Sequence, residues 1–347
     1  MAVNYVMRPS RLGDLQSLIE LAELSGPGFT SLPVDVQILR ERLQKSDDAF
    51  LGRLHRIEYG KYLLMMEDAE TGEVVGCSAV KAGTGIDQPF FNYRVITLAQ
   101  ASQAAGNLRF DMDALVLTNE YVGYTEVGTL FLKPEHRGGG AGRLAAQSRY
   151  LLMAAAPDRF GDKVLAELRG VVDNEGRSPF WECLGRHFFR MDFTEADRLS
   201  ATTDNQFILD LMPKYPIYVD LLPPEAREVI GRCHSDGVGA YKLLQWEGFE
   251  FDRTVDIFDG GPLVTAQRRH IRTIQESCRI RFEAGDVDAD PAAVQGLASS
   301  DTLPEFRASL AKSILKDPDT AVVSPDTLEI LKLKPGAEGR IWQRSKS

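Results

Sequence analysis

The spacing of apolar positions changes along the chain, and each change predicts a new element. NYVMRPS reads as a short strand, and apolar residues then recur at helical spacing in RLGDLQSLIELAELSG until Gly26 stops the pattern. KYLLMMEDAETGEVVGCSAVKAG holds two apolar runs separated by a polar segment that ends in Thr71-Gly72, which is typical of a β-hairpin. The first part of the chain therefore predicts a strand, a helix and a hairpin.

The middle of the chain continues this alternation. TEVGTLFLKPEHRGGGAGRLAAQSRYLLMAAA, from Thr125 to Ala156, runs an apolar strand into a glycine cluster and a long apolar helix. KVLAELRGVV is short and apolar enough for a buried strand. In SPFWECLGRHFFRMDF, Ser178-Pro179 suits the start of a helix, and the pattern passes through Gly185 into what reads as an aromatic strand. This order predicts a mixed α/β fold.

A similar order of elements returns later in the chain. GVGAYKLLQWEGFEFDRTVDIFDGG, from Gly237 to Gly261, reads as a short helix followed by an extended run, so we take residues 215–262 as a candidate for a partial internal duplication. Beyond about residue 275, prolines and glycines punctuate short apolar runs. We therefore expect one domain over residues 1–275, with its core at 124–193, and a small β-rich extension over residues 276–347.

Composition narrows the class of protein. The 347 residues include 40 Lys and Arg against 50 Asp and Glu, a net charge of −10, so neither nucleic acid nor an anionic membrane surface is an expected partner. The four cysteines are far apart, which argues against structural zinc and against a disulfide scaffold. No apolar run approaches the roughly 18 residues of a membrane span. We expect a soluble cytoplasmic protein with no metal and no permanently bound cofactor.

The glycine cluster after the strand suits an anion. The first turn of a helix presents unpaired N–H groups and the positive end of its dipole, and glycines leave room for a phosphate to approach. GAGRLA, from Gly140 to Ala145, also fits a dinucleotide pattern with Asp162 as the ribose ligand, but KPEHR separates it from the strand. A glycine-rich turn between two core elements is the other alternative. Arg137-x-x-Gly140-x-Gly142 favours a pyrophosphate.

This arginine and glycine spacing, and the order of elements around it, resemble the GNAT acyl-CoA N-acyltransferases, whose pyrophosphate motif has the same form. A closer resemblance rests on further motifs. They are TSLP (Thr30 to Pro33), FNYRV (Phe91 to Val95), TLFL (Thr129 to Leu132), AELRGV (Ala166 to Val171), SPFW (Ser178 to Trp181), FFRMDF (Phe188 to Phe193), LMPKYPIY (Leu211 to Tyr218), VIGRCH (Val229 to His234) and DIFDGGP (Asp256 to Pro262). Together they resemble the arginine N-succinyltransferase family over roughly residues 5 to 275.

The resemblance implies an activity and two site residues. It implies transfer of succinyl from succinyl-CoA, bound as a co-substrate, to the α-amine of arginine, the first step of succinyl-dependent arginine breakdown. His234 then corresponds to the proton donor and Leu130 to a succinyl-CoA contact. It leaves open a weakly active partner subunit of a heteromeric enzyme, and an acceptor other than arginine, such as ornithine. We expect a homo-oligomer, or a hetero-oligomer with a related chain.

Four further residues are candidates for substrate binding. Arg94 and Arg169 lie in extended apolar contexts, where a cation needs a partner such as a substrate carboxylate, although internal salt bridges explain them equally well. Glu126 and Glu167 could hold a guanidinium through paired hydrogen bonds, or could serve packing. DIFDGG lacks the further ligands of a calcium loop and reads as a turn.

Overall fold

The computed structural model describes residues 4–26, 31–173, 175–202 and 205–344, so Thr30 of the TSLP motif lies outside the described residues. The first elements follow the predicted order, with a strand, a helix and a β-hairpin. They are β1 (Tyr5–Pro9), α1 (Leu15–Ser25), α2 (Val36–Phe50), β2 (Lys61–Asp68) and β3 (Val74–Lys81). β2 and β3 pair antiparallel, which confirms the predicted hairpin.

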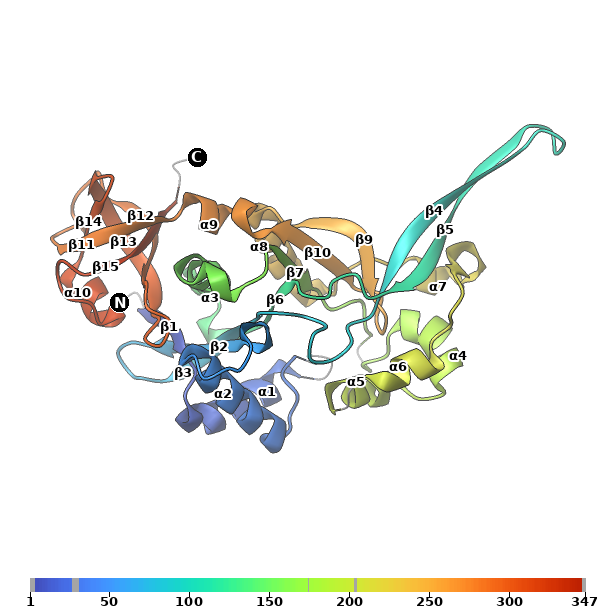
Figure 1. Cartoon of the computed structure of the whole chain (residues 1–347), viewed down its shortest axis with the longest axis horizontal. Helices are drawn as coiled ribbons and strands as arrows, with labels where there is room; N and C mark the ends of the chain where they lie inside the picture. Colours follow the sequence, from blue (N-terminus) through green and yellow to red (C-terminus); the bar gives the residue numbers. More distant parts are fainter. Residues whose placement is uncertain (1–3, 27–30, 174, 203–204, 345–347) are drawn as a thin grey trace.

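The central elements contain the predicted strand, glycine cluster and helix. They are β4 (Asn92–Ser102), β5 (Leu108–Thr118), β6 (Thr125–Leu132), α3 (Ala141–Ala155) and β7 (Lys163–Glu167). β4 and β5 pair along all 11 residues of each strand. Their outer part is exposed and projects far from the rest of the molecule as a two-stranded arm (Figure 1).

The next region is mainly helical. It contains the π-helix η5 (Trp181–Gly185), α4 (Arg186–Phe189), α5 (Phe193–Thr202), α6 (Gln206–Leu211), β8 (Ile217–Tyr218), α7 (Pro224–Arg227), α8 (Val238–Glu247), β9 (Glu250–Asp256), β10 (Pro262–Gln267) and α9 (Arg272–Glu276). α8 followed by β9 confirms the helix and extended run expected there. The duplication itself stays a prediction.

The predicted aromatic strand after Gly185 is wrong, because these residues are helical. Trp181, Gly185 and Phe189 are spaced four apart, which places them on one helical face, and Phe193 begins the next helix, α5. The ring centroids of Trp181 and Phe189 are 5.1 Å apart, and a Cβ at Gly185 would stand 2.2 Å from the Trp181 ring. Burying this aromatic face outweighs the strand propensity of the individual residues.

The last part of the chain is rich in strands. It contains β11 (Cys278–Ala284), β12 (Val294–Ser300), β13 (Ala308–Asp317), β14 (Thr320–Val323), α10 (Pro325–Leu331) and β15 (Glu338–Gln343). β13 pairs with β1, at Val6 with Ser309 and Met7 with Ala308. This pairing joins the last strands to the rest in one ladder of 15 described strands. The division of the chain at residue 275 stays a prediction.

Helices cover both faces of the central strands. In β2, Leu63 and Met65 pack against α1 and α2, whereas Tyr62 and Leu64 face the core around α3. β2 is therefore buried on both faces, which explains its continuous apolar run. The core around α3 also includes side chains of β12 and β15, so α3 lies between the central sheet and the last strands (Figure 1).

Candidate functional site

The hydrogen bonding between β6 and β7 is short, and this positions the candidate site. The two strands are parallel and pair only at Thr125 with Val164 and at Glu126 with Leu165. On its other edge, β6 pairs with β3, and on its other edge β7 pairs with β10. The backbone of β6 from Gly128 onward therefore has one side that no described strand covers.

A bulge changes the direction of β6 at this point. The register with β3 shifts between Cys77 and Ala79, and Thr129 has a φ of 51°. A left-handed φ is unusual for a β-branched residue and is maintained only when the surroundings enforce it. The Thr129 carbonyl accepts a hydrogen bond from Cys77 Sγ at 3.5 Å. Leu130, the predicted acyl-CoA contact, follows this bulge and is half-buried.

β6 leads directly to the glycine cluster and α3. Gly138, Gly139 and Gly140 have φ values of 112°, 56° and 97°, which are conformations that favour glycine. The backbone conformation therefore explains why so many glycines occur here. Arg137 is exposed, and its Nε donates to the Leu132 carbonyl at 3.2 Å, which holds the side chain beside the start of α3. Gly142 lies in the first turn of α3. Arg137, Gly140 and Gly142 therefore surround the helix N-terminus, as the sequence predicted.

His234 lies next to the end of β7. Its backbone N–H donates to the Arg169 carbonyl at 2.7 Å, and Cys233 forms a bridge with Gly170. The His234 Nδ1 accepts from the backbone N–H of Asp236 at 3.2 Å. Because Nδ1 is the acceptor, the neutral ring carries its proton on Nε2. The Nε2 N–H group can therefore donate a hydrogen bond to a ligand, and the backbone anchor of His234 fixes its place relative to β7.

Carboxylates gather on the same side of β7. Burial raises the pKa of Glu167 well above its usual value, and the charges of Asp256 and Glu126 raise it further. Glu167 is nevertheless accessible to solvent. Its neighbours are polar, because Asn92 Nδ2 donates to Glu167 Oε1 at 3.5 Å and Thr84 Oγ1 donates to Glu126 Oε2 at 3.1 Å. Such a group of carboxylates attracts a cation.

Asp256 and Asp259 hold the turn between β9 and β10. Asp256 Oδ1 accepts from the N–H groups of Phe258 and Asp259, at 2.7 and 2.9 Å. Asp259 Oδ2 accepts from Gly170 N–H at 2.7 Å. These bonds confirm that DIFDGG forms a turn, and they attach it to the loop that follows β7. In the described ranges no three His, Cys, Asp or Glu side chains are arranged to hold a metal ion.

Two arginines near this region form no ion pair with a carboxylate of the described residues. The Nε of Arg169 is buried and has no hydrogen-bond partner in the described structure. Arg42 of α2 donates to the Ser31 carbonyl, and burial lowers the pKa of its guanidinium. A desolvated guanidinium without a carboxylate is suited to bind an anionic group of a ligand.

The structure brings most of the predicted residues together, with one exception. Glu126, Glu167, Arg169 and His234 lie around β7 and its following loop, whereas Leu130 and the glycine cluster lie along β6 and the start of α3. Arg94 is in a separate network: its Nε donates to Glu120 at 2.6 Å, and its NH2 group lies 3.3 Å from Asp252 Oδ2. Arg94 therefore forms internal salt bridges, which was the alternative to substrate binding.

Sequence reasoning missed Arg42 and Asn92. Arg42 lies in an amphipathic helix among other charged residues, so nothing in the local pattern distinguishes it. Asn92 is fully buried at the start of β4, and the FNYRV motif contained it without indicating its bond to Glu167. An asparagine in an apolar run was the one available signal, since buried polar groups need partners.

The mixed α/β fold, the short pairing of β6 and β7, and the glycine-rich start of α3 define an acyltransferase of the GNAT class. A family model for the arginine N-succinyltransferase beta subunit matches residues 5–273. The chain belongs to the arginine N-succinyltransferase family.

Whole-length relatives agree with this assignment. The arginine N-succinyltransferase of Yersinia enterocolitica is 40% identical over 337 residues, covering 94% of this chain and 97% of the relative. The arginine N-succinyltransferase subunit beta of Pseudomonas aeruginosa is 41% identical over 337 residues, covering 96% of this chain and 97% of the relative. The solved structure of arginine/ornithine succinyltransferase subunit AI from Pseudomonas aeruginosa has a TM-score of 0.88 and 31% identity, covering 99% of this chain and all of that one.

Proposed function

We propose that the enzyme transfers succinyl from succinyl-CoA to the α-amine of L-arginine, giving N2-succinylarginine and CoA. The observation that carries the proposal is the position of His234 beside the end of β7, where β7 and β6 no longer pair. Membership of the family supports the choice of both substrates. The chain has no helix within its described residues that could cross a membrane. We place the reaction in the cytoplasm, where the free cysteines stay reduced.

Succinyl-CoA binds along β6 and at the start of α3 in this proposal. Arg137 and the backbone N–H groups of the first turn of α3, next to Gly140 and Gly142, hold the pyrophosphate. The bulge at Thr129 directs the backbone of Leu130 toward the acyl arm. The uncovered backbone of β6 then bonds the pantetheine as a strand would, so the thioester reaches the region of His234.

The reaction needs an amine nucleophile and a proton for the leaving group. The neutral α-amine attacks the thioester carbonyl, the tetrahedral intermediate collapses, and the C–S bond breaks. The protonated imidazole of His234 gives its Nε2 proton to the departing CoA thiolate and becomes neutral, and the proton released by the attacking amine then restores the imidazolium. No covalent intermediate with the enzyme is required.

Charge complementarity supports arginine as the acceptor. Glu167 and Glu126 take the guanidinium, whose fork of N–H groups matches carboxylates. Arg169 and Arg42 provide cations for the two carboxylates of the reactants, one on the succinyl group and one on the acceptor. The enzyme thus positions a zwitterionic amino acid with a cationic side chain.

The first experiment measures CoA thiol release from succinyl-CoA with arginine, ornithine, lysine and no acceptor, using the purified chain alone. Release that depends on arginine is the expected result. The ratio of kcat/KM for arginine and ornithine then decides which acceptor is preferred, a question raised by the arginine/ornithine enzyme of Pseudomonas aeruginosa. If no acceptor stimulates release while a verified relative is active, the proposal fails.

The partner-subunit alternative is not favoured, because relatives that align over nearly the whole chain bear the name of the enzyme itself. We nevertheless propose that the enzyme assembles as a homo-oligomer, or as a hetero-oligomer with a related chain. The exposed arm of β4 and β5 supports this, since an isolated two-stranded ribbon is marginally stable in water. Sedimentation of the purified chain measures its assembly.

The proposed pyrophosphate contact gives a prediction. Arg137→Gln should raise KM for succinyl-CoA about tenfold, because it removes a charge-assisted contact, and should leave kcat nearly unchanged. Arg109→Gln, on the exposed arm, is the matched control and should have no effect on KM. Unchanged KM in the Arg137 variant would place the pyrophosphate elsewhere.

A further inference from the structure

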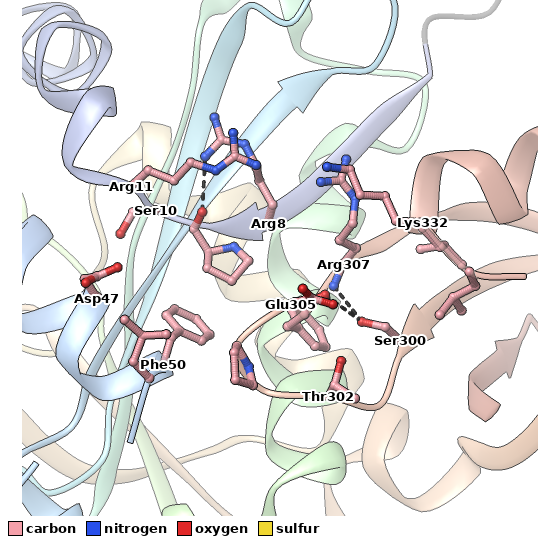
Figure 2. A pocket seen from close by; sticks show the side chains of 16 residues that line it. Arg8, Ser10, Arg11, Asp47, Phe50, Ser300, Thr302, Glu305, Arg307 and Lys332 are labelled. Carbon is pink, nitrogen blue, oxygen red and sulfur yellow. Dashed lines mark hydrogen bonds between the residues drawn. The ribbon is translucent and has the colours of Figure 1, made fainter. Parts of the chain in front are cut away.

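A cavity of about 270 Å³ lies where β1 meets the last strands. In the strand order β2 and β3 separate β1 from β6, so the cavity is apart from the proposed reaction site. Arg8 and Arg11 come from the β1 side, and Arg307 and Lys332 come from the side of β13 and α10 (Figure 2). Phe50 of α2 contributes an apolar part of the wall. The cavity therefore spans the junction that the β1 and β13 pairing creates.

The four cations differ in how they are neutralised. Arg8 makes two bonds to Asp14, at 2.8 and 2.9 Å, and an ion pair with Glu67, so its charge is satisfied. Arg11, Arg307 and Lys332 form no ion pair with any carboxylate of the described chain. Two carboxylates also line the cavity, Asp47 and Glu305. Asp47 lies 3.5 Å from Arg53, and among the described residues neither Asp47 nor Glu305 forms an ion pair with Arg11, Arg307 or Lys332.

Arg307 is the most informative of these residues. It is only 8% exposed, and its Nε donates to the carbonyl of Ile330 near the end of α10 at 2.6 Å. Burial lowers the pKa of its guanidinium and the charges of Arg11 and Arg8 lower it further, whereas Glu67 raises it. A buried guanidinium beside two other cations is costly unless an anion accompanies it. Glu67 is already bound to Arg8.

We propose that this cavity binds a small metabolite through a carboxylate or phosphate group held by Arg11, Arg307 and Lys332. The volume suits a small molecule, and the three cations approach from both sides of the junction. The ligand would lie between the strand that begins the fold and the strands that end it. Its binding would therefore stabilise the junction, apart from the acyl-transfer chemistry.

The probes are inorganic phosphate and succinate, titrated separately into the full chain by calorimetry and by thermal unfolding at constant ionic strength. Three variants are compared with the native protein: Arg307→Gln, Arg11→Gln and Arg137→Gln. Arg137→Gln weakens the proposed pyrophosphate site. Arg11 is exposed, so its replacement keeps the fold even if Arg307→Gln does not.

We expect saturable binding of at least one probe, with a rise in Tm. Affinity should fall about tenfold or more in Arg11→Gln and in Arg307→Gln, and should be unchanged in Arg137→Gln. The probe that binds more tightly identifies the anionic group. The proposal is overturned if neither probe binds saturably, or if Arg11→Gln and Arg307→Gln both keep the native affinity.

Discussion

His234→Ala is expected to lower kcat by about 10²–10⁴-fold, the usual contribution of a positioned general acid. The variant loses the Nε2 proton for the departing thiolate, whereas the glycine cluster and β6 are untouched. The backbone bond from residue 234 to the Arg169 carbonyl, at 2.7 Å, does not depend on the imidazole and should keep the loop in place. Steady-state kinetics with succinyl-CoA and arginine measure kcat, and calorimetry measures binding of CoA.

His187→Ala is the matched control, because His187 is exposed on α4 and away from β7. It should keep full activity. If His234→Ala loses CoA binding together with turnover, His234 has a binding role instead. If it keeps most of its activity, another group donates the proton.

Glu167→Gln should raise KM for arginine about 10–100-fold, because a charge-assisted pair with the guanidinium is lost. The same change should raise Tm at neutral pH in the absence of substrate. Reduced hydration and the like charges of Asp256 and Glu126 raise the pKa of Glu167, so its ionised form opposes folding until a cation arrives. Asp162→Asn is the control, since Asp162 is exposed and pairs only with Arg268 at 3.3 Å.

The direction of the pH effect follows from the raised pKa of Glu167. Between its usual value and its raised value, the folded protein binds more protons than the unfolded chain, so stability falls as pH rises through this window. Substrate binding has the opposite dependence, because the guanidinium needs the ionised carboxylate. Thermal unfolding at about pH 5 and about pH 8 should show a smaller decrease in Glu167→Gln than in the native protein. An equal decrease in both would contradict this account.

Local patterns predicted the elements that bring the site together. The strand, glycine cluster and helix from Thr125 to Ala156 were recognisable because glycines with positive φ interrupt two strongly apolar runs. The hairpin of β2 and β3 followed from its apolar runs and the turn at Thr71-Gly72. These patterns depend only on residues that are close in sequence, so the elements they predict are found in the folded structure.

Contacts between distant segments were not predictable in the same way. The helical face of Trp181, Gly185 and Phe189 was visible as a spacing of four, but the aromatic residues also suit a strand, and only their packing decides between the two. Arg42 is a candidate site residue only because the fold places it against the Ser31 carbonyl and near Glu126, which are distant in sequence or outside its helix. The pairing of β1 with β13 links residues about 300 positions apart, beyond any periodicity in the chain.

That pairing also has a consequence while the protein is being synthesised. At roughly 5–20 residues per second, synthesis from Val6 to Ser309 takes on the order of 15–60 s. During this time one edge of β1 lacks its partner, and the core around α3 lacks Leu297, Phe306 and Trp342. An unpaired strand edge above an incomplete core invites association with other chains. This edge of β1 therefore stays open to such contacts from the synthesis of Val6 until Ser309 has emerged and β13 can pair with β1.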